Sequence, residues 1–209
     1  KKKKKYPPQG TPYLTREVKD LRWTPETSKE IEIKLDKVVL AEGTVIDAST
    51  GKPLQGASVQ YYPAMTNDRR LLDDIVSGWQ SIQKTDSSGK FQIPVLPGPG
   101  TLLVYAAEKN YILQERDSEV LNIGKPGGAR MYAHAFQKIN PAKEETLKPM
   151  KIELQPGATV AGTLVDEQGK PITHAIMISR LKPDPLSPDW RGLPVELNNG
   201  TFELHGLRG

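Results

Sequence analysis

The chain has 209 residues, with 29 lysines and arginines against 25 aspartates and glutamates, and a formal charge of +4. Five of these cations are Lys1–Lys5, so the rest of the chain is nearly neutral, which argues against binding to nucleic acid or to a membrane surface. No run approaches the roughly 18 apolar residues of a membrane helix, and the absence of cysteine excludes disulfides, thiolate zinc sites and a cysteine nucleophile.

Residues 1–36 are interpreted as the tail of a preceding module and a linker. The first module, residues 37–149, begins with short runs in which apolar side chains alternate with others, as in strands whose successive side chains face opposite sides. The predicted inward positions are Ala41, Gly43 and Val45, then Ala57, Val59 and Tyr61, then Phe91, Ile93 and Val95. Asp47–Gly51 and Asp86–Gly89 lie between these runs and have the Asp and Gly chemistry of tight turns.

An insertion, residues 63–84, interrupts the first module, and Asn67–Val76 within it predicts a short capped helix. The apolar run Thr101–Ala106 predicts a strand that completes the sheet. After a glycine-rich loop, the larger side chains of Arg130–Phe136 alternate as in another strand.

An internal repeat predicts a second module, residues 150–209. Ile33–Leu35 and Glu42–Asp47 recur as Ile152–Leu154 and Ala161–Asp166, at an offset of 119 residues. The predicted core of this module is Val160, Gly162, Leu164, Ala175, Met177, Phe202 and Leu204. The counterpart of the strand at 101–106 would come after Gly209. We therefore expect the chain to be an excerpt of a longer protein, with an exposed core and strand edge that favour aggregation or a loose second module.

Four segments of the first module resemble the carboxypeptidase regulatory-like domain: Gly43–Asp47, Thr50–Ala57, Thr85–Ile93 and Leu96–Gly98. The resemblance implies a transthyretin-like, seven-stranded β-sandwich of a kind found after metallocarboxypeptidase catalytic domains and, in tandem, in large bacterial envelope proteins. It implies an accessory or structural role outside the cytoplasm. The expected fold class is therefore all-β, with two tandem Ig- or transthyretin-like sandwiches, the second incomplete at its C-terminus.

The sequence predicts no catalytic, cofactor-binding or metal-binding residue, and therefore a protein that is not an enzyme. None of His134, His174 and His205 has the glutamate three residues later that a carboxypeptidase zinc pair needs, so these histidines are interpreted as surface or half-buried strand residues. The Gly-Lys pairs lack the first glycine of a nucleotide-binding loop, and the segment around Ser58 lacks the last glycine of a nucleophile elbow.

Aromatic side chains are the candidates for ligand binding, with Tyr62, Trp79 and Trp190 as the predicted set, because flat amphipathic rings stack on sugars and anchor protein interfaces. These rings could instead pin the insertions to the sandwich. The preferred function is a non-catalytic spacer or docking pair of sandwiches in a larger extracytoplasmic protein, with neighbouring modules, another protein or a glycan as partners. The alternatives are a carbohydrate-binding module and an accessory domain of a peptidase.

Overall fold

The computed structural model describes residues 10–14, 32–35, 37–67, 82–108, 110–123, 130–178 and 194–208. These residues form strands joined by turns and loops, which confirms the predicted all-β class. The strands are β1 (Val39–Asp47), β2 (Ser58–Pro63), β3 (Gln83–Lys84), β4 (Lys90–Val95), β5 (Gly100–Tyr105), β6 (Gln114–Asp117), β7 (Arg130–Ala133), β8 (Ala135–Ile139), β9 (Met150–Leu154), β10 (Ala158–Thr163), β11 (His174–Ile178), β12 (Pro194–Asn198) and β13 (Thr201–Leu207). In this part of the chain no helix is long and apolar enough to span a membrane.

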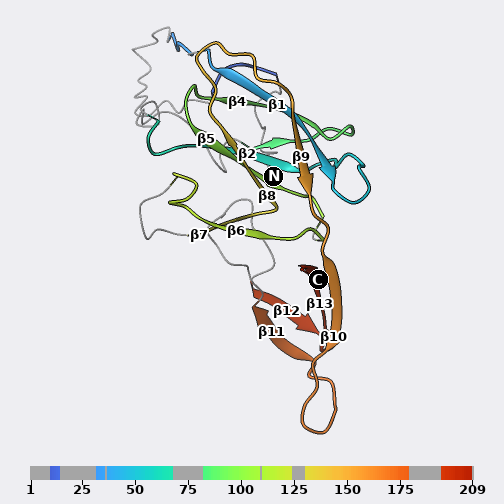
Figure 1. The fold of residues 1–209 in the computed structure, drawn as a ribbon. Helices are drawn as coiled ribbons and strands as arrows, with labels where there is room; N and C mark the ends of the chain where they lie inside the picture. The colour runs from blue at the N-terminus through green and yellow to red at the C-terminus, as the bar shows by residue number, and fades with distance from the viewer. Residues whose placement is uncertain are drawn as a thin grey trace, which may run out of the picture.

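The first module is a sandwich of two sheets, ordered β4-β1-β9 and β3-β2-β5-β8 (Figure 1). All the inward positions predicted for its strands are buried, because alternate side chains of both sheets meet in one core. The predicted apolar strand at 101–106 is β5, and it pairs with both β2 and β8. In the β1–β4 pair, the ring of Phe91 covers Gly43, where a Cβ would lie 2.8 Å from the ring.

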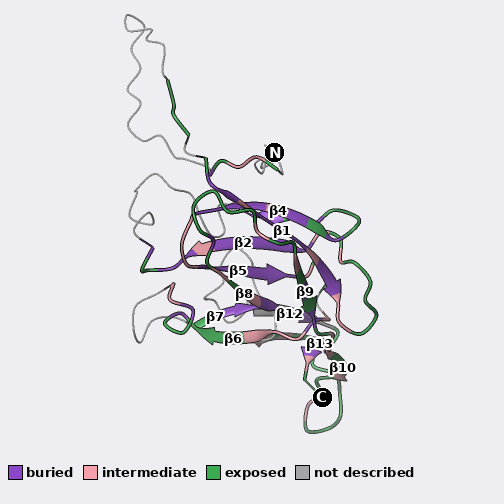
Figure 2. Ribbon diagram, turned by 45° about the horizontal axis from the view of Figure 1, so that its top comes forward, coloured by how far each residue is buried: buried purple, intermediate pink, exposed green. Residues whose placement is uncertain are grey.

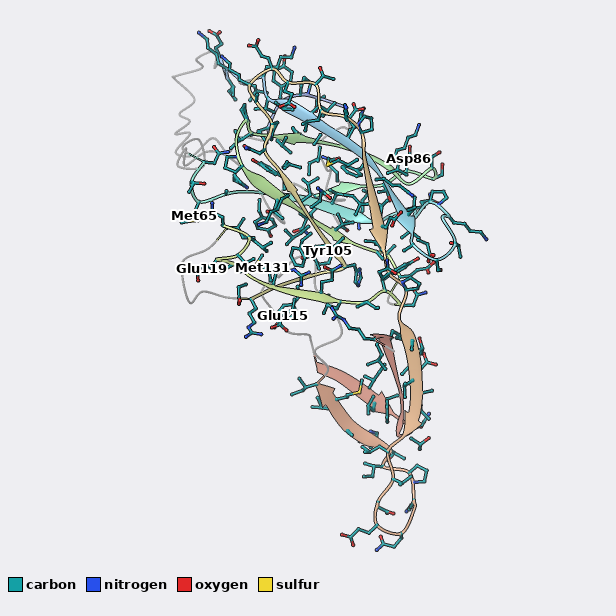
Figure 3. All side chains as sticks on the ribbon, viewed as in Figure 1. Met65, Asp86, Tyr105, Glu115, Glu119 and Met131 are labelled. Carbon is teal, nitrogen blue, oxygen red and sulfur yellow. The ribbon has the colours of Figure 1, made fainter. Side chains whose placement is uncertain are left out.

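A third layer covers the outer face of the larger sheet (Figure 2). The β6–β7 ribbon packs there, with Met131 and Ala133 of β7 against Leu103 and Tyr105 of β5 (Figure 3). Strand β5 is therefore buried on both faces. The strand predicted at Arg130–Phe136 is two strands, β7 and β8, because the chain passes from the ribbon to the sheet at His134.

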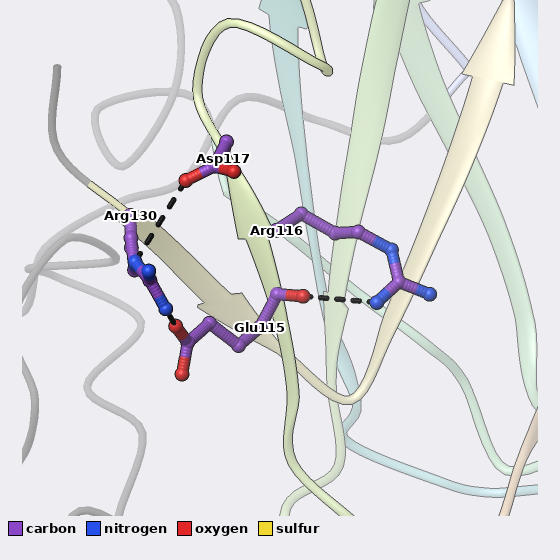
Figure 4. A network of polar contacts seen from close by, with 4 residues as sticks. All are labelled: Glu115, Arg116, Asp117 and Arg130. Atoms are coloured by element: carbon purple, nitrogen blue, oxygen red, sulfur yellow. Dashed lines mark hydrogen bonds and ion pairs between the residues drawn. The ribbon is translucent and has the colours of Figure 1, made fainter. Parts of the chain in front are cut away.

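Charged side chains on the solvent side of this ribbon link its two strands (Figure 4). Arg130 of β7 forms an ion pair with Glu115 of β6, and its Nε lies 3.7 Å from Asp117 Oδ1. Arg130 and both its partners are exposed, so we expect each ion pair to contribute little to the stability of the fold. Packing of Met131 and Leu121 beneath the ribbon is the larger stabilising contribution.

The predicted turns form around aspartates that accept hydrogen bonds from backbone N–H groups. Asp47, Asp86 and Asp166 accept, at 2.8 to 3.0 Å, from Ser49 and Thr50, from Ser88 and Lys90, and from Gln168 and Lys170, respectively. Gly89 closes one of these turns with a φ of +70°, and a Cβ there would lie 2.6 Å from the carbonyl oxygen of Val45. The turn therefore requires glycine.

In the described residues after β9, the second module forms two ribbons, β10–β13 and β11–β12 (Figure 1). By the repeat, they correspond to β1–β4 and β2–β3. The predicted core positions are not buried: Val160 and Leu164 are exposed, and Gly162, Ala175, Met177, Phe202 and Leu204 are half-buried. That prediction of burial is wrong, because the first module covers its equivalent positions with β5, β8 and β9, and no such strands stand over these ribbons in the described residues.

The structure shows segments on both sides of the predicted first module, residues 37–149, that pack with it. Met150–Leu154, assigned from the sequence to the second module, forms β9 in the sheet of β1, so we propose that the boundary lies between β9 and β10. Within residues 1–36, Leu14 packs in the core of the first module, and the N–H of Val38 donates to the carbonyl of Pro12 at 2.8 Å. The helix predicted in the first insertion lies outside the described residues, apart from Asn67.

Candidate functional site

The junction between the modules is a three-residue link, 155–157, whose two ends are hydrogen-bonded to the segment 110–112 of the first module. The N–H of Ile112 donates to the carbonyl of Gln155 at 2.8 Å, and the N–H of Gly157 donates to the carbonyl of Asn110 at 2.7 Å. Between these bonds, Tyr111 and Pro156 form an isolated β-bridge. The link is therefore paired like a strand, which restricts movement of β10 relative to β9.

Tyr111 ties this junction to the end of β1. Its hydroxyl donates to Asp47 Oδ2 at 3.0 Å, while Asp47 Oδ1 organises the turn after β1. Burial, and then the hydrogen bond to Asp47, raise the pKa of Tyr111 to about 12. The pKa of Asp47 is lowered, chiefly by the hydroxyl of Ser49 and the N–H of Thr50. Tyr111 is thus a neutral donor and Asp47 a charged acceptor at neutral pH.

His134 lies beside this junction and is 2% exposed, which differs from the expected surface or half-buried position. The centroid of its ring is 6.3 Å from that of Tyr105 and 6.1 Å from that of Tyr111. Its Nδ1 accepts the N–H of Ala106 at 2.8 Å, so the neutral ring carries its proton on Nε2. Burial lowers the pKa of His134 to about 4, which keeps the ring neutral.

The three histidines do not converge on a common site. His174 is exposed, and His205 is half-buried beside Thr159 Oγ1, 3.1 Å away, and Glu203, 3.3 Å away. Across the described ranges there is no group of three or more histidines and acidic residues placed to hold a metal ion.

Of the predicted ligand-binding residues, the structure describes one. Tyr62 is half-buried against the cluster beneath the β6–β7 ribbon, and its hydroxyl donates to Gln60 Oε1 at 3.3 Å. Trp79 and Trp190 lie outside the described residues, so the three-residue ligand site stays a prediction. Tyr62 lines neither of two surface hollows, of about 480 and 340 Å³.

The edge of β10 is the feature of the second module that differs most from its counterpart. Strand β1 has β4 on one side and β9 on the other, whereas β10 is paired with β13 alone among the described residues. Val45 and Ile46 on β1 are buried, but their repeat equivalents Leu164 and Val165 are 37% and 47% exposed. Sequence reasoning found the repeat but did not show that this particular edge is open.

No family model and no curated protein sequence matches the chain. Among solved structures, it is similar to a streptococcal ancillary pilin (12% identity, TM-score 0.40), with 88% of this chain and 56% of that chain covered. It is also similar to the shaft pilin SpaA of Lactobacillus rhamnosus GG (14%, 0.37; 59% and 49% covered) and to the TIE protein of Bacillus anthracis (17%, 0.34; 83% and 28% covered). The chain thus spans less than two thirds of each of these proteins, and TM-scores below 0.5 support no functional comparison.

Proposed function

We propose that this chain is a non-catalytic structural and interaction segment, in which two β-sandwich modules are held in a fixed arrangement as a spacer or docking unit. The observation that carries the proposal is the paired junction at 155–157. A link that is hydrogen-bonded at both ends to residues 110–112 of the first module transmits orientation and force between modules, whereas a free glycine-rich link would let them move independently.

The finer assignment, to the carboxypeptidase regulatory-like class in a larger extracytoplasmic protein, belongs to the same proposal. It is supported by the motif resemblance and by the two sheets of the first module, whose three and four strands together make the seven that the resemblance implies.

The rigidity of the junction can be tested by measuring a distance distribution between the modules. Because the chain has no cysteine, spin labels can be placed at Lys138→Cys on β8 and Glu167→Cys in the second module, both exposed positions. Pulsed electron–electron double resonance should give one narrow distribution of distances between the two labels. Pro156→Gly, at the junction, should broaden it.

The matched control is Pro53→Gly, which removes a proline from a similar isolated bridge, with Ile46, outside the 155–157 link. This variant should leave the distribution narrow. A broad distribution in the parent labelled protein, of the kind a flexible linker gives, would refute the proposed fixed arrangement.

A further inference from the structure

His134 holds the connection between β5 and β6 at three places. The N–H of Ala106, directly after β5, donates to its ring Nδ1 at 2.8 Å, and Gln114 Nε2, at the start of β6, donates to its carbonyl at 3.0 Å. Between these two ends, the centroid of the Tyr111 ring lies 6.1 Å from that of the His134 ring. A single buried histidine therefore fixes the course of this connection.

The same connection holds the link between the modules. In the described part of the chain, the link 155–157 is bonded to the first module through the segment 110–112, by two backbone hydrogen bonds and the Tyr111–Pro156 bridge. Strand β10 begins at the next residue, Ala158 (Figure 1). If the segment 110–113 moves away, the link stays joined to β9 but loses its pairing.

The segment 110–113 is also the element beside His134 that can move most easily. The strand on the other side of the ring, β5, carries Tyr105 and is paired on both edges, with β2 and β8. The segment 110–113 belongs to no strand, and it is anchored by the two bonds to the link and by the bond from the Tyr111 hydroxyl to Asp47. Segments held by few contacts open locally at a lower free energy than the whole fold.

The titrating charge at this place belongs to His134. The titratable groups packed against its ring are the phenols of Tyr105 and Tyr111. The charged groups that act on Tyr111 are Asp47 and Glu108. Burial lowers the pKa of His134, and no described acidic side chain forms an ion pair with it. Hydrogen bonds from the turn after β1 lower the pKa of Asp47, so this carboxylate stays charged between pH 7.5 and 5.

We propose that protonation of His134 releases the segment 110–113 and with it the junction, so that acid converts the fixed pair of modules into a hinged pair. This inference rests on the proposed function, because it names what regulates the junction that carries that function. A protonated ring loses the N–H of Ala106 and needs contact with water, so protons bind more tightly to the released form than to the closed form. The equilibrium constant for release should therefore rise about 25-fold between pH 7.5 and 5.

Hydrogen exchange of single amides, measured by nuclear magnetic resonance at pH 7.5 and 5, tests the release. The reporters are the N–H groups of Ile112 and Gly157, which form the two bonds of the junction, and the reference is the N–H of Val45, which donates to Gly89 at 2.8 Å in the core. After correction for the intrinsic pH dependence of exchange, the opening constants of the reporters should rise about 25-fold on acidification. They should also exceed that of Val45 and respond little to low urea concentrations, because a local opening exposes little surface.

Two histidine variants assign the response to one ring. His134→Asn keeps an acceptor for the N–H of Ala106 but does not titrate, so acid should no longer change the opening constants of the reporters. His205→Asn is the matched control, because this histidine also lies beside the link: a Cβ on Gly157 would lie 2.6 Å from the backbone of Gly206. The acid response should persist in this control.

A third variant, Tyr111→Phe, tests the anchor of the segment separately from the histidine. It removes the hydrogen bond to Asp47 but keeps the ring beside His134. The opening constants of Ile112 and Gly157 should be about tenfold higher at both pH values, with the acid response unchanged.

The spin-label pair described above reports the consequence for the modules. The distance distribution of the parent labelled protein should be narrow at pH 7.5 and gain a broad component at pH 5, whereas that of His134→Asn should stay narrow at both. Three results would each overturn the proposal: exchange of Ile112 and Gly157 only together with Val45, an acid response that survives in His134→Asn, or a parent distribution that stays narrow at pH 5. A distribution already broad at pH 7.5 contradicts the proposed function instead, and amide exchange still shows whether His134 controls the segment, so the two failures are distinguishable.

Discussion

Protonation of His134 should destabilise the first module, and the structure gives both the direction and the size of the effect. The ring is buried between Tyr105 and Tyr111, and its Nδ1 accepts the N–H of Ala106. A proton added to Nδ1 would point at that N–H, so the charged ring would lose its hydrogen bond and also be buried without a counter-charge. Folding therefore favours the neutral form.

The pKa of His134 is about 4 in the folded chain, against 6.5 for an ordinary histidine. Between these two values the unfolded chain binds more protons, so stability rises with pH in this window. The contribution is fully present above pH 6.5 and is lost as the pH falls toward 4. A difference of this size corresponds to about 3 kcal/mol of unfolding free energy.

The assay is urea unfolding, followed by far-ultraviolet circular dichroism, of the parent protein and His134→Asn at several pH values from 7.5 to 4. Asparagine Oδ1 can still accept the N–H of Ala106 but does not titrate, and its smaller side chain costs stability equally at every pH. The stability difference between the two proteins should therefore shrink by about 3 kcal/mol on acidification. Parallel pH profiles, or a His134 resonance that titrates near 6.5, would refute the burial argument.

Two substitution pairs test the turns and the core with internal controls. Gly89→Ala should lower the free energy of unfolding by more than about 2 kcal/mol, because the new Cβ meets the carbonyl of Val45. Gly51→Ala has a similar positive φ but open space around it, and should lower it by about 1 kcal/mol. Equal losses in urea unfolding would contradict this prediction. Leu154→Ala should lower the free energy of unfolding by about 2 to 5 kcal/mol, because Leu154 is buried in the core. Leu35→Ala should change it by less than about 0.5 kcal/mol, because Leu35 is exposed. A large loss at Leu35 would mean that this side chain is covered in solution.

Local patterns in the sequence were sufficient to predict strands β1, β2, β4 and β5 of the first module and the turns after β1 and before β4. The inward positions of β1, β2 and β4 follow from alternation, and the turns follow from the chemistry of aspartate and glycine, both of which act over a few residues. The third layer was not predicted. Its signal is the run at Thr101–Tyr105, which has apolar residues at consecutive positions and therefore indicates a strand covered on both faces.

Features set by contacts between distant segments could not be predicted in this way. The parallel pairing of β9 with β1 joins residues more than one hundred positions apart, and nothing in Met150–Leu154 itself specifies which sheet it enters. The burial of His134 depends in the same way on Tyr105 and Tyr111, which come from different segments. The ligand-binding set of Tyr62, Trp79 and Trp190 stays a prediction.

The two modules together separate what a strand's own sequence determines from what its neighbours determine. Strand β10 repeats the pattern of β1 and pairs with β13 as β1 pairs with β4, so this local pairing forms without the rest of the sandwich. Burial does not follow from the repeated pattern, since Val45 is buried whereas its repeat equivalent Leu164 is 37% exposed. The difference lies in the strands that β1 has beside and above it, of which β9 is the one whose sequence recurs, at residues 32–35, as an exposed segment.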